Sequence, residues 1–158
     1  MNKKTLTLAS VIASTYVMLG YMFQSIAFGQ IQVRIADALY PLISLGIPFL
    51  LGAFIGHLIF NMYGFTTGIA LGIGDLISPF ILLIPKILIW KFGKSKVGLT
   101  ITTIIHVTSA SLWVSYLLCI MFGLPMIVSV PLIFIGEFIA EVILGIPLTL
   151  VIKKGGIN

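Results

Sequence analysis

The stretch Gln30-Ile31-Gln32-Val33-Arg34-Ile35-Ala36-Asp37-Ala38-Leu39 places two amides, a guanidinium and a carboxylate inside a chain that is otherwise almost entirely apolar. The 158 residues are 59% hydrophobic and only 8% charged, with a mean hydropathy of +1.23. Most of the chain is therefore expected to lie in a lipid bilayer. Charged residues at membrane depth are costly, and those that occur usually face a cavity, a partner or a polar ligand. The few polar residues of this chain carry the information about its function.

Hydrophobic runs interrupted by glycine and proline predict an all-α membrane protein with a single transmembrane domain over residues 1–158. A full crossing takes about 20 apolar residues, so five or six crossings nearly exhaust the chain. The hydrophobic pattern predicts a bundle of six transmembrane helices over residues 5–22, 32–45, 47–63, 75–92, 99–122 and 128–152. The second and third spans are the least distinct, because they could also be interpreted as one long helix.

The distribution of basic residues favours six spans. With the N-terminus in the cytoplasm, six spans place every lysine on or near the cytoplasmic side and leave Arg34 as the basic residue of the outer half. These lysines are Lys3, Lys4, Lys86, Lys91, Lys94, Lys96, Lys153 and Lys154. The net charge of +5 thus reflects lysines at helix ends and not a nucleic-acid-binding surface. We expect a multi-pass protein of the plasma membrane with both termini in the cytoplasm.

Arg34 and Asp37 lie three residues apart, so on a helix they would share a face and could neutralise each other as a structural ion pair. The alternative is that Gln30, Gln32 and Arg34 reach into a ligand cavity near the outer surface. A simple salt bridge requires neither amide, so the pattern favours the cavity.

Three further carboxylates lie in or at the ends of apolar spans. Asp75 begins the fourth expected span, where the helix dipole favours a negative charge, and it would also face the outer cavity. Glu137 lies inside the last span, where an ionised side chain is costly without a partner. Glu141 follows one turn later, and the two carboxylates could attract a cation or one of them could stay protonated. We interpret Glu137 as a ligand contact, whereas the pattern assigns no role to Glu141.

The aromatic and histidine side chains each have a structural and a functional interpretation. His57 and His106 lie in apolar helices, where interhelical hydrogen bonds are the common role. Neither has a cysteine or an acidic residue at the sequence spacing of metal ligands, so we assign no metal and no cofactor. Trp113 and Tyr116 could stack on a planar ligand or anchor the helix at the membrane interface.

The segment F-G-Q-I-Q-V-R-I-A-D-A-L, residues 28–39, closely resembles the second-helix motif of the queuosine-precursor transporters (QueT-like). These proteins are substrate-binding S components of energy-coupling factor (ECF) transporters. The segment from Gly52 to Asn61 resembles the glycine-rich third helix of the family, and Gly136-Glu137 with L-G-I-P-L at residues 144–148 resembles its last helix. Ala9-x-x-x-Ala13 is similar to the motif by which S components dock on their membrane partner.

The chain departs from the family pattern at a few positions. Ala36-Asp37 stands where the family typically has serine and glutamate, which preserves the acidic group. His106 and Ser129 lie near positions where the family usually carries asparagine. The resemblance therefore indicates the family more firmly than the substrate.

The resemblance implies an S-component fold, a 7-deazaguanine substrate such as 7-aminomethyl-7-deazaguanine or queuine, and three partners: a transmembrane coupling subunit and two ATPase subunits. Glu137 would accept the donor edge of the ring, a glutamine or Arg34 would donate to the ring oxygen, and Asp75 or Asp37 would hold the aminomethyl cation. The substrate-binding residues would be Gln30, Gln32, Arg34, Asp37, Asn61, Asp75, His106, Trp113 and Glu137, and the docking residues would be Ala9 and Ala13.

Three alternatives remain open at this point. The chain could bind another vitamin-like compound on the same fold, or it could be a membrane scaffold whose polar residues only pair helices. A membrane enzyme using Glu137, Glu141 and His106 would lack a nucleophile and base at recognisable spacing. Gly93-Lys94-Ser95 lacks the earlier glycine of a nucleotide-binding loop, so no ATPase activity is expected of this chain.

Overall fold

The structure is a computed structural model that describes residues 2–27 and 32–156. These residues are helical apart from short connections, so the prediction of an all-α protein is confirmed. The elements in chain order are α1 (Lys3–Met22), α2 (Gln24–Ala27), the 3₁₀ helix η1 (Ile35–Leu45), α3 (Ile47–Thr67), α4 (Gly72–Ile81), α5 (Leu83–Phe92), α6 (Lys96–Phe122), α7 (Met126–Glu137), the π-helix η2 (Phe138–Gly145) and α8 (Ile146–Lys154).

Within the described residues, five helical segments are long and apolar enough to cross a membrane. They are α1 (Lys3–Met22), α3 (Ile47–Thr67), α4 together with α5 (Gly72–Phe92), α6 (Lys96–Phe122) and the run of α7, η2 and α8 (Met126–Lys154). The chain is therefore a multi-pass membrane protein. Six full-length spans are not confirmed, because the second expected span is the 11-residue helix η1. At about 2.0 Å per residue, η1 is roughly 22 Å long, shorter than a hydrocarbon core of about 30 Å.

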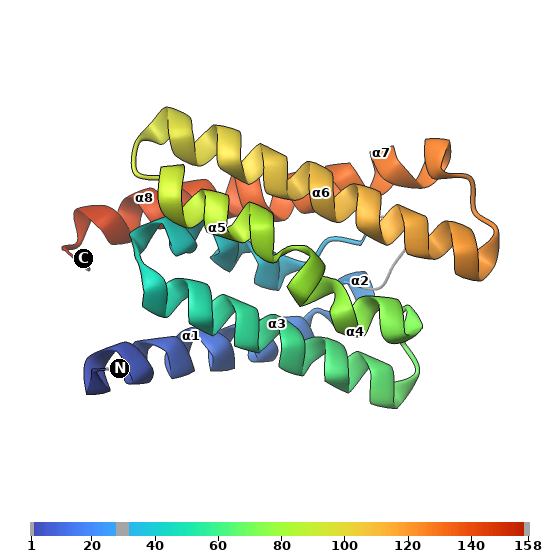
Figure 1. The fold of residues 1–158 in the computed structure, drawn as a ribbon, viewed down its shortest axis with the longest axis horizontal. Coiled ribbons are helices and arrows are strands. Elements are labelled where there is room, and N and C mark those ends of the chain that lie inside the picture. Colours follow the sequence, from blue (N-terminus) through green and yellow to red (C-terminus); the bar gives the residue numbers. More distant parts are fainter. Residues whose placement is uncertain (1, 28–31, 157–158) are drawn as a thin grey trace.

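Helix η1 lies in the middle of the bundle. It contacts α1, α3, α5, α8 and η2, and residues 36–44 are all buried. Figure 1 shows α1 and α3 side by side on one flank and α6 with α7 and α8 on the other. Irregular backbone at membrane depth is tolerated where it is enclosed by protein, which explains how a 3₁₀ helix containing Pro41 persists there.

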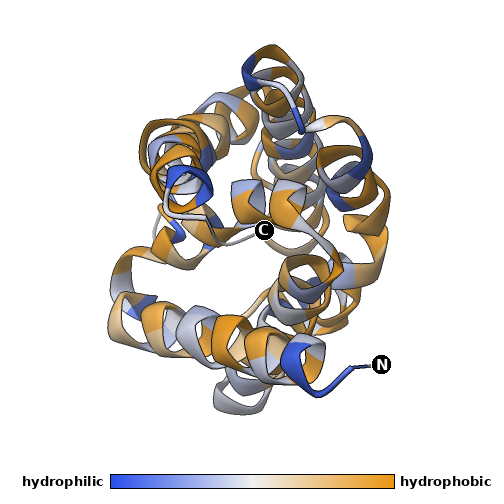
Figure 2. Cartoon of the chain, turned by 90° about the vertical axis from the view of Figure 1, so that its left-hand side faces the viewer, coloured by the Kyte–Doolittle hydropathy of each residue, from blue (hydrophilic) through white to orange (hydrophobic). Residues whose placement is uncertain are grey.

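Both termini lie at one end of the bundle, together with the turn between α5 and α6 (Figure 1). Figure 2 views this end and shows largely hydrophobic helices with hydrophilic residues at the N-terminal tip. The lysines of the first helix, of the α5–α6 turn and of the last helix are thus gathered at the same end. They are Lys3, Lys4, Lys91, Lys94, Lys96, Lys153 and Lys154, and all are exposed.

Small residues allow α1 and α3 to pack backbone against backbone. A Cβ atom added to Gly52 would lie 2.6 Å from the carbonyl oxygen of Ala9, and one added to Gly56 would lie 3.0 Å from that of Ala13. Ala9 and Ala13 are consequently 4% and 8% exposed. These two alanines therefore pack against α3 of the same chain, and their expected role in docking to another subunit stays a prediction.

Two prolines shape the span that α4 and α5 form together, Gly72–Phe92. Pro85 cannot follow a regular helix, since its ring clashes with the carbonyl group four residues earlier, and α4 ends at that residue, Ile81. Pro79 likewise has no N–H group for the carbonyl oxygen of Asp75. That oxygen instead accepts hydrogen bonds from Asn61 Nδ2 at 2.6 Å and from Ser78 Oγ at 2.7 Å. The proline therefore ties α4 to α3 at the position of a buried acid.

Candidate polar binding site

The interior of the bundle contains every acidic residue of the protein. The four carboxylates, Asp37, Asp75, Glu137 and Glu141, are each at most 3% exposed. Of the nine basic residues, only Arg34 and Lys86 are buried. With all six groups ionised, the interior carries a formal charge of −2, although the chain as a whole carries +5. Such an excess of buried charge is costly unless a carboxyl group takes up a proton or the site binds a charged partner.

Arg34 forms an ion pair with Asp75. Its Nη2 atom lies 3.3 Å from Oδ1 and 3.4 Å from Oδ2, and the backbone N–H of Leu71 also donates to Oδ2 at 3.1 Å. The sequence spacing had suggested Asp37 as the partner in a structural pair. Arg34 precedes η1 instead of lying within it, so the helical three-residue rule does not determine its direction.

Asp37 takes part in a chain of hydrogen bonds that crosses the bundle. The Tyr16 hydroxyl donates to Asp37 Oδ1 and lies 3.0 Å from the Tyr40 hydroxyl. The Tyr40 hydroxyl in turn lies 2.6 Å from Nδ1 of His57. Because the Lys86 ammonium has no lone pair and lies 3.0 Å from the same Nδ1, this nitrogen must be the acceptor. The network links α1, η1, α3 and α5.

The position of Lys86 contradicts the sequence interpretation. Lys86 was grouped with the lysines at the cytoplasmic helix ends, but its side chain is 0% exposed and its Nζ atom lies 4.4 Å from the centre of the Tyr40 ring. Lys86 precedes the end of α5 by six residues and lies in the apolar run I-L-L-I-P-K-I-L-I-W. This distance from the helix end is the sequence signal that could have identified it as a buried lysine.

His106 and Glu141 form a second buried contact. Nδ1 of His106 lies 2.8 and 3.0 Å from the two carboxylate oxygens of Glu141, so the histidine has the acidic partner that its sequence neighbours did not reveal. Glu141 lies in the π-helix η2, which follows directly after Glu137, the last residue of α7. Oxygen atoms of Asp37, Glu137 and Glu141 all lie within 4.8 Å of one another. We call these three carboxylates the acid triad.

Several buried polar atoms of the site have no hydrogen-bond partner among the described residues. The acceptors include Gln32 Oε1, Asn61 Oδ1 and Glu137 Oε2, and the ring nitrogens include His106 Nε2 and Trp113 Nε1. Since buried polar groups are nearly always paired, a set of this kind points to a polar ligand. Five residues expected from the sequence to bind substrate thus expose unused hydrogen-bonding groups to the interior.

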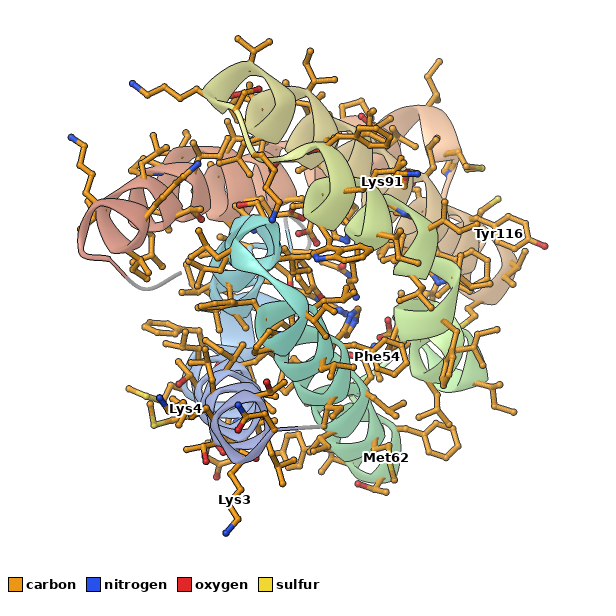
Figure 3. The ribbon with its side chains drawn as sticks, turned by 60° about the vertical axis from the view of Figure 1, so that its left-hand side comes forward. Lys3, Lys4, Phe54, Met62, Lys91 and Tyr116 are labelled. Carbon is orange, nitrogen blue, oxygen red and sulfur yellow. The ribbon has the colours of Figure 1, made fainter. Side chains whose placement is uncertain are left out.

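The remaining expected site residues are distributed as follows. Gln30 lies outside the residues that the structure describes. Gln32 is 4% exposed and has a left-handed backbone with φ +44°, a strained conformation that occurs preferentially at functional sites. Tyr116 is 48% exposed and points away from the bundle, as does Lys3 (Figure 3). Of the two outer aromatics on α6, Trp113 is therefore the one whose polar atom is buried.

Comparison with known proteins gives an independent result. A family model described as the QueT transporter matches residues 6–154, which is nearly the whole chain. The chain belongs to the QueT transporter family. A search of curated proteins finds no match, and a search of solved structures finds none either. Membership of the QueT family supports a role in transport and not in catalysis, and it agrees with the resemblance seen in the segment at residues 28–39.

Sequence reasoning missed several members of the site. Tyr16, Tyr40 and Ser78 lie in apolar helices and resemble ordinary packing residues in the sequence, yet all three are at most 1% exposed and hydrogen-bonded in the polar interior. A hydroxyl group in an apolar helix carries little cost at the surface, so composition does not reveal which ones face inward.

Proposed function

We propose that this member of the QueT family is the substrate-binding S component of an ECF transporter and that its polar interior binds a 7-deazaguanine precursor of queuosine. The observation that carries the proposal is the set of unpartnered polar atoms in the buried interior, contributed by Gln32, by α3, by α6 and by α7. A scaffold protein that only paired its helices would be expected to satisfy these groups internally.

The chemistry of a 7-deazaguanine complements this set. The ring presents an acceptor oxygen beside a donor edge formed by a ring N–H and an exocyclic amine. The unpartnered oxygens of Gln32, Asn61 and Glu137 are suited to the donor edge, and Trp113 Nε1 is suited to the acceptor oxygen. Discrimination should come from hydrogen bonds, because a mismatched ligand would leave buried polar groups unpaired.

Transport requires partners in this proposal. The S component would capture substrate at the outer surface and associate with a transmembrane coupling subunit and two ATPase subunits, which supply the energy for reorientation. We place both termini in the cytoplasm, because the exposed lysines gather at the end of the bundle that carries them (Figure 1). In this arrangement η1 is the short second member of a six-helix S-component bundle.

The test is a titration of 7-aminomethyl-7-deazaguanine into the purified protein in detergent. Replacing Glu137→Gln removes the charge of a buried acceptor while keeping its shape, and we expect the affinity to fall by about tenfold or more. Thr108→Ala is a suitable control, since its exposed hydroxyl only donates to the carbonyl of Ile104 in its own helix.

The outcomes separate the alternatives. Equal affinities of the wild type and Glu137→Gln would remove Glu137 from the site. If the ligand fails to stabilise the folded protein while another vitamin-like compound raises its melting temperature, the substrate assignment is wrong but the S-component role stands. Failure to associate with any coupling subunit on co-expression would contradict the ECF role.

A further inference from the structure

The charge balance of the interior restricts the kind of ligand that the site can accept. Four buried carboxylates face two buried cations, and the Arg34–Asp75 ion pair uses one group of each sign. The remaining carboxylates are the acid triad of Asp37, Glu137 and Glu141. Lys86 is the remaining buried cation, and its Nζ atom is directed at His57 and the Tyr40 ring.

Lys86 does not neutralise the triad by direct contact. Among the described residues, Arg34 with Asp75 is the lysine or arginine ion pair within 4.0 Å, and the contact of His106 with Glu141 carries a positive charge only when the histidine is protonated. The triad thus gathers three carboxylates with no lysine or arginine bound to it. Glu137 is 1% exposed, and its Oε2 atom is one of the unpartnered acceptors. This orphaned oxygen is a second observation, independent of the clustering, that points to a missing donor.

We propose that the acid triad binds the protonated amine of the substrate, so that the site selects 7-deazaguanines bearing an alkylammonium group over uncharged ones. This inference rests on the proposed function and assigns the cation to the triad instead of to Asp75, which is already paired with Arg34. An ammonium group has three donors and no acceptor, which matches three carboxylates around one point.

The triad is compact enough for one ammonium group to reach an oxygen of each carboxylate. A nitrogen atom that donates three hydrogen bonds of about 2.8 Å in tetrahedral directions places its acceptors roughly 4.6 Å apart. The triad oxygens lie within 4.8 Å of one another. The site also already accommodates one ammonium near an aromatic ring, since Lys86 lies over Tyr40.

A divalent metal ion is the competing occupant and fits less well. Calcium requires six to eight oxygen ligands, and magnesium usually keeps several of its waters. Both oxygens of Glu141 are engaged by His106, and Oδ1 of Asp37 accepts from Tyr16. A full coordination shell would need more oxygens than the triad offers, whereas an ammonium needs one further lone pair from each carboxylate, which an oxygen that already accepts one hydrogen bond still has.

The experiment compares two ligands that share the ring and differ in charge. Calorimetric titration of the purified protein with 7-aminomethyl-7-deazaguanine and with 7-cyano-7-deazaguanine should show the amine binding about tenfold tighter or more, since hydrogen bonds between charged groups are stronger than those between neutral groups. In Glu141→Gln the preference should fall to about threefold or less, and the nitrile should bind as before. The glutamine can still accept a hydrogen bond from His106.

The matched control is Asp75→Asn, which also removes one negative charge from the interior but outside the triad. It should keep the preference for the amine, even if it weakens both ligands. Asp37→Asn serves as a second triad variant should Glu141→Gln fail to fold.

Each result bears on the proposal. Equal binding of the two ligands, or an undiminished preference in both triad variants, would overturn the triad assignment and leave the proposed function intact. Binding of neither ligand would overturn both. Stabilisation of the wild type by manganese chloride, lost in Glu141→Gln and competing with the amine, would replace the ammonium by a metal ion.

Discussion

The seam between α1 and α3 and the polar interior are both buried, but they are built in opposite ways. At the seam, Ala9 and Ala13 meet Gly52 and Gly56 so closely that a single added Cβ would lie 2.6 Å from a backbone oxygen. This contact has no side-chain polar group to satisfy. The interior, which α1 and α3 reach through Tyr16, His57 and Asn61, carries carboxylates, an arginine and a lysine from other elements, together with unpartnered polar atoms.

The contrast separates stability from function. In a bilayer, close packing of small residues is a main source of helix association. Buried charges contribute little net stability, because desolvation offsets most of their attraction, although breaking a pair is costly. A protein selected only for stability would extend the seam inward. Four carboxylates in the interior are instead what the proposed ligand site requires.

The largest expected effect tests the interior. Arg34→Gln leaves Asp75 buried without its cation, and we expect a loss of about 3–5 kcal/mol in the free energy of unfolding. Unfolding in detergent, followed by thermal or denaturant titration, measures this loss. The double variant with Asp75→Asn should recover a large part of it, because no lone charge remains. A double variant as unstable as Arg34→Gln alone would show that the ion pair is not the source of the effect.

An intermediate effect tests the seam. Gly52→Ala places a methyl group against the Ala9 carbonyl and Ile12, and overpacking of this kind costs about 1–3 kcal/mol. The same unfolding measurement should show this loss, and the folded fraction should bind the amine ligand with nearly wild-type affinity. Ser10→Ala, on the exposed side of α1, is the control and should change neither quantity. Loss of binding with unchanged stability would mean that the seam and the site are not separate.

The smallest expected effect sharpens the boundary of the site. Trp113→Phe removes an unpartnered indole N–H, and we expect the substrate affinity to fall by about 2- to 10-fold with little change in stability. Tyr116→Phe is the matched control three residues further along α6, because its hydroxyl lies on the outward side. Equal effects of the two variants on affinity would place Trp113 outside the site.

Much of the fold followed from hydrophobic runs and their breaks. The long spans lie close to their expected positions, and the break between η1 and α3 occurs at Gly46, as expected. The 3₁₀ conformation of η1 could not be predicted, since it depends on enclosure by six other elements, α6 among them. The acidic residues were recognised in the sequence because a charged side chain in lipid has a high free-energy cost. The residues that pair with them could not be recognised there. Arg34 pairs with a residue 41 positions away and His106 with one 35 away.

The sequence by itself determined that this chain lies in a membrane, roughly where it crosses, and which few polar residues are the candidates for its site, because the cost of placing charge in hydrocarbon depends on residue type alone. Only the tertiary structure decided that Lys86 belongs to the interior, that Ala9 and Ala13 are covered by α3, and that the acids Asp37, Glu137 and Glu141 converge. Those facts depend on which faces of distant helices meet, and periodicity along one helix contains no information about its neighbour's face.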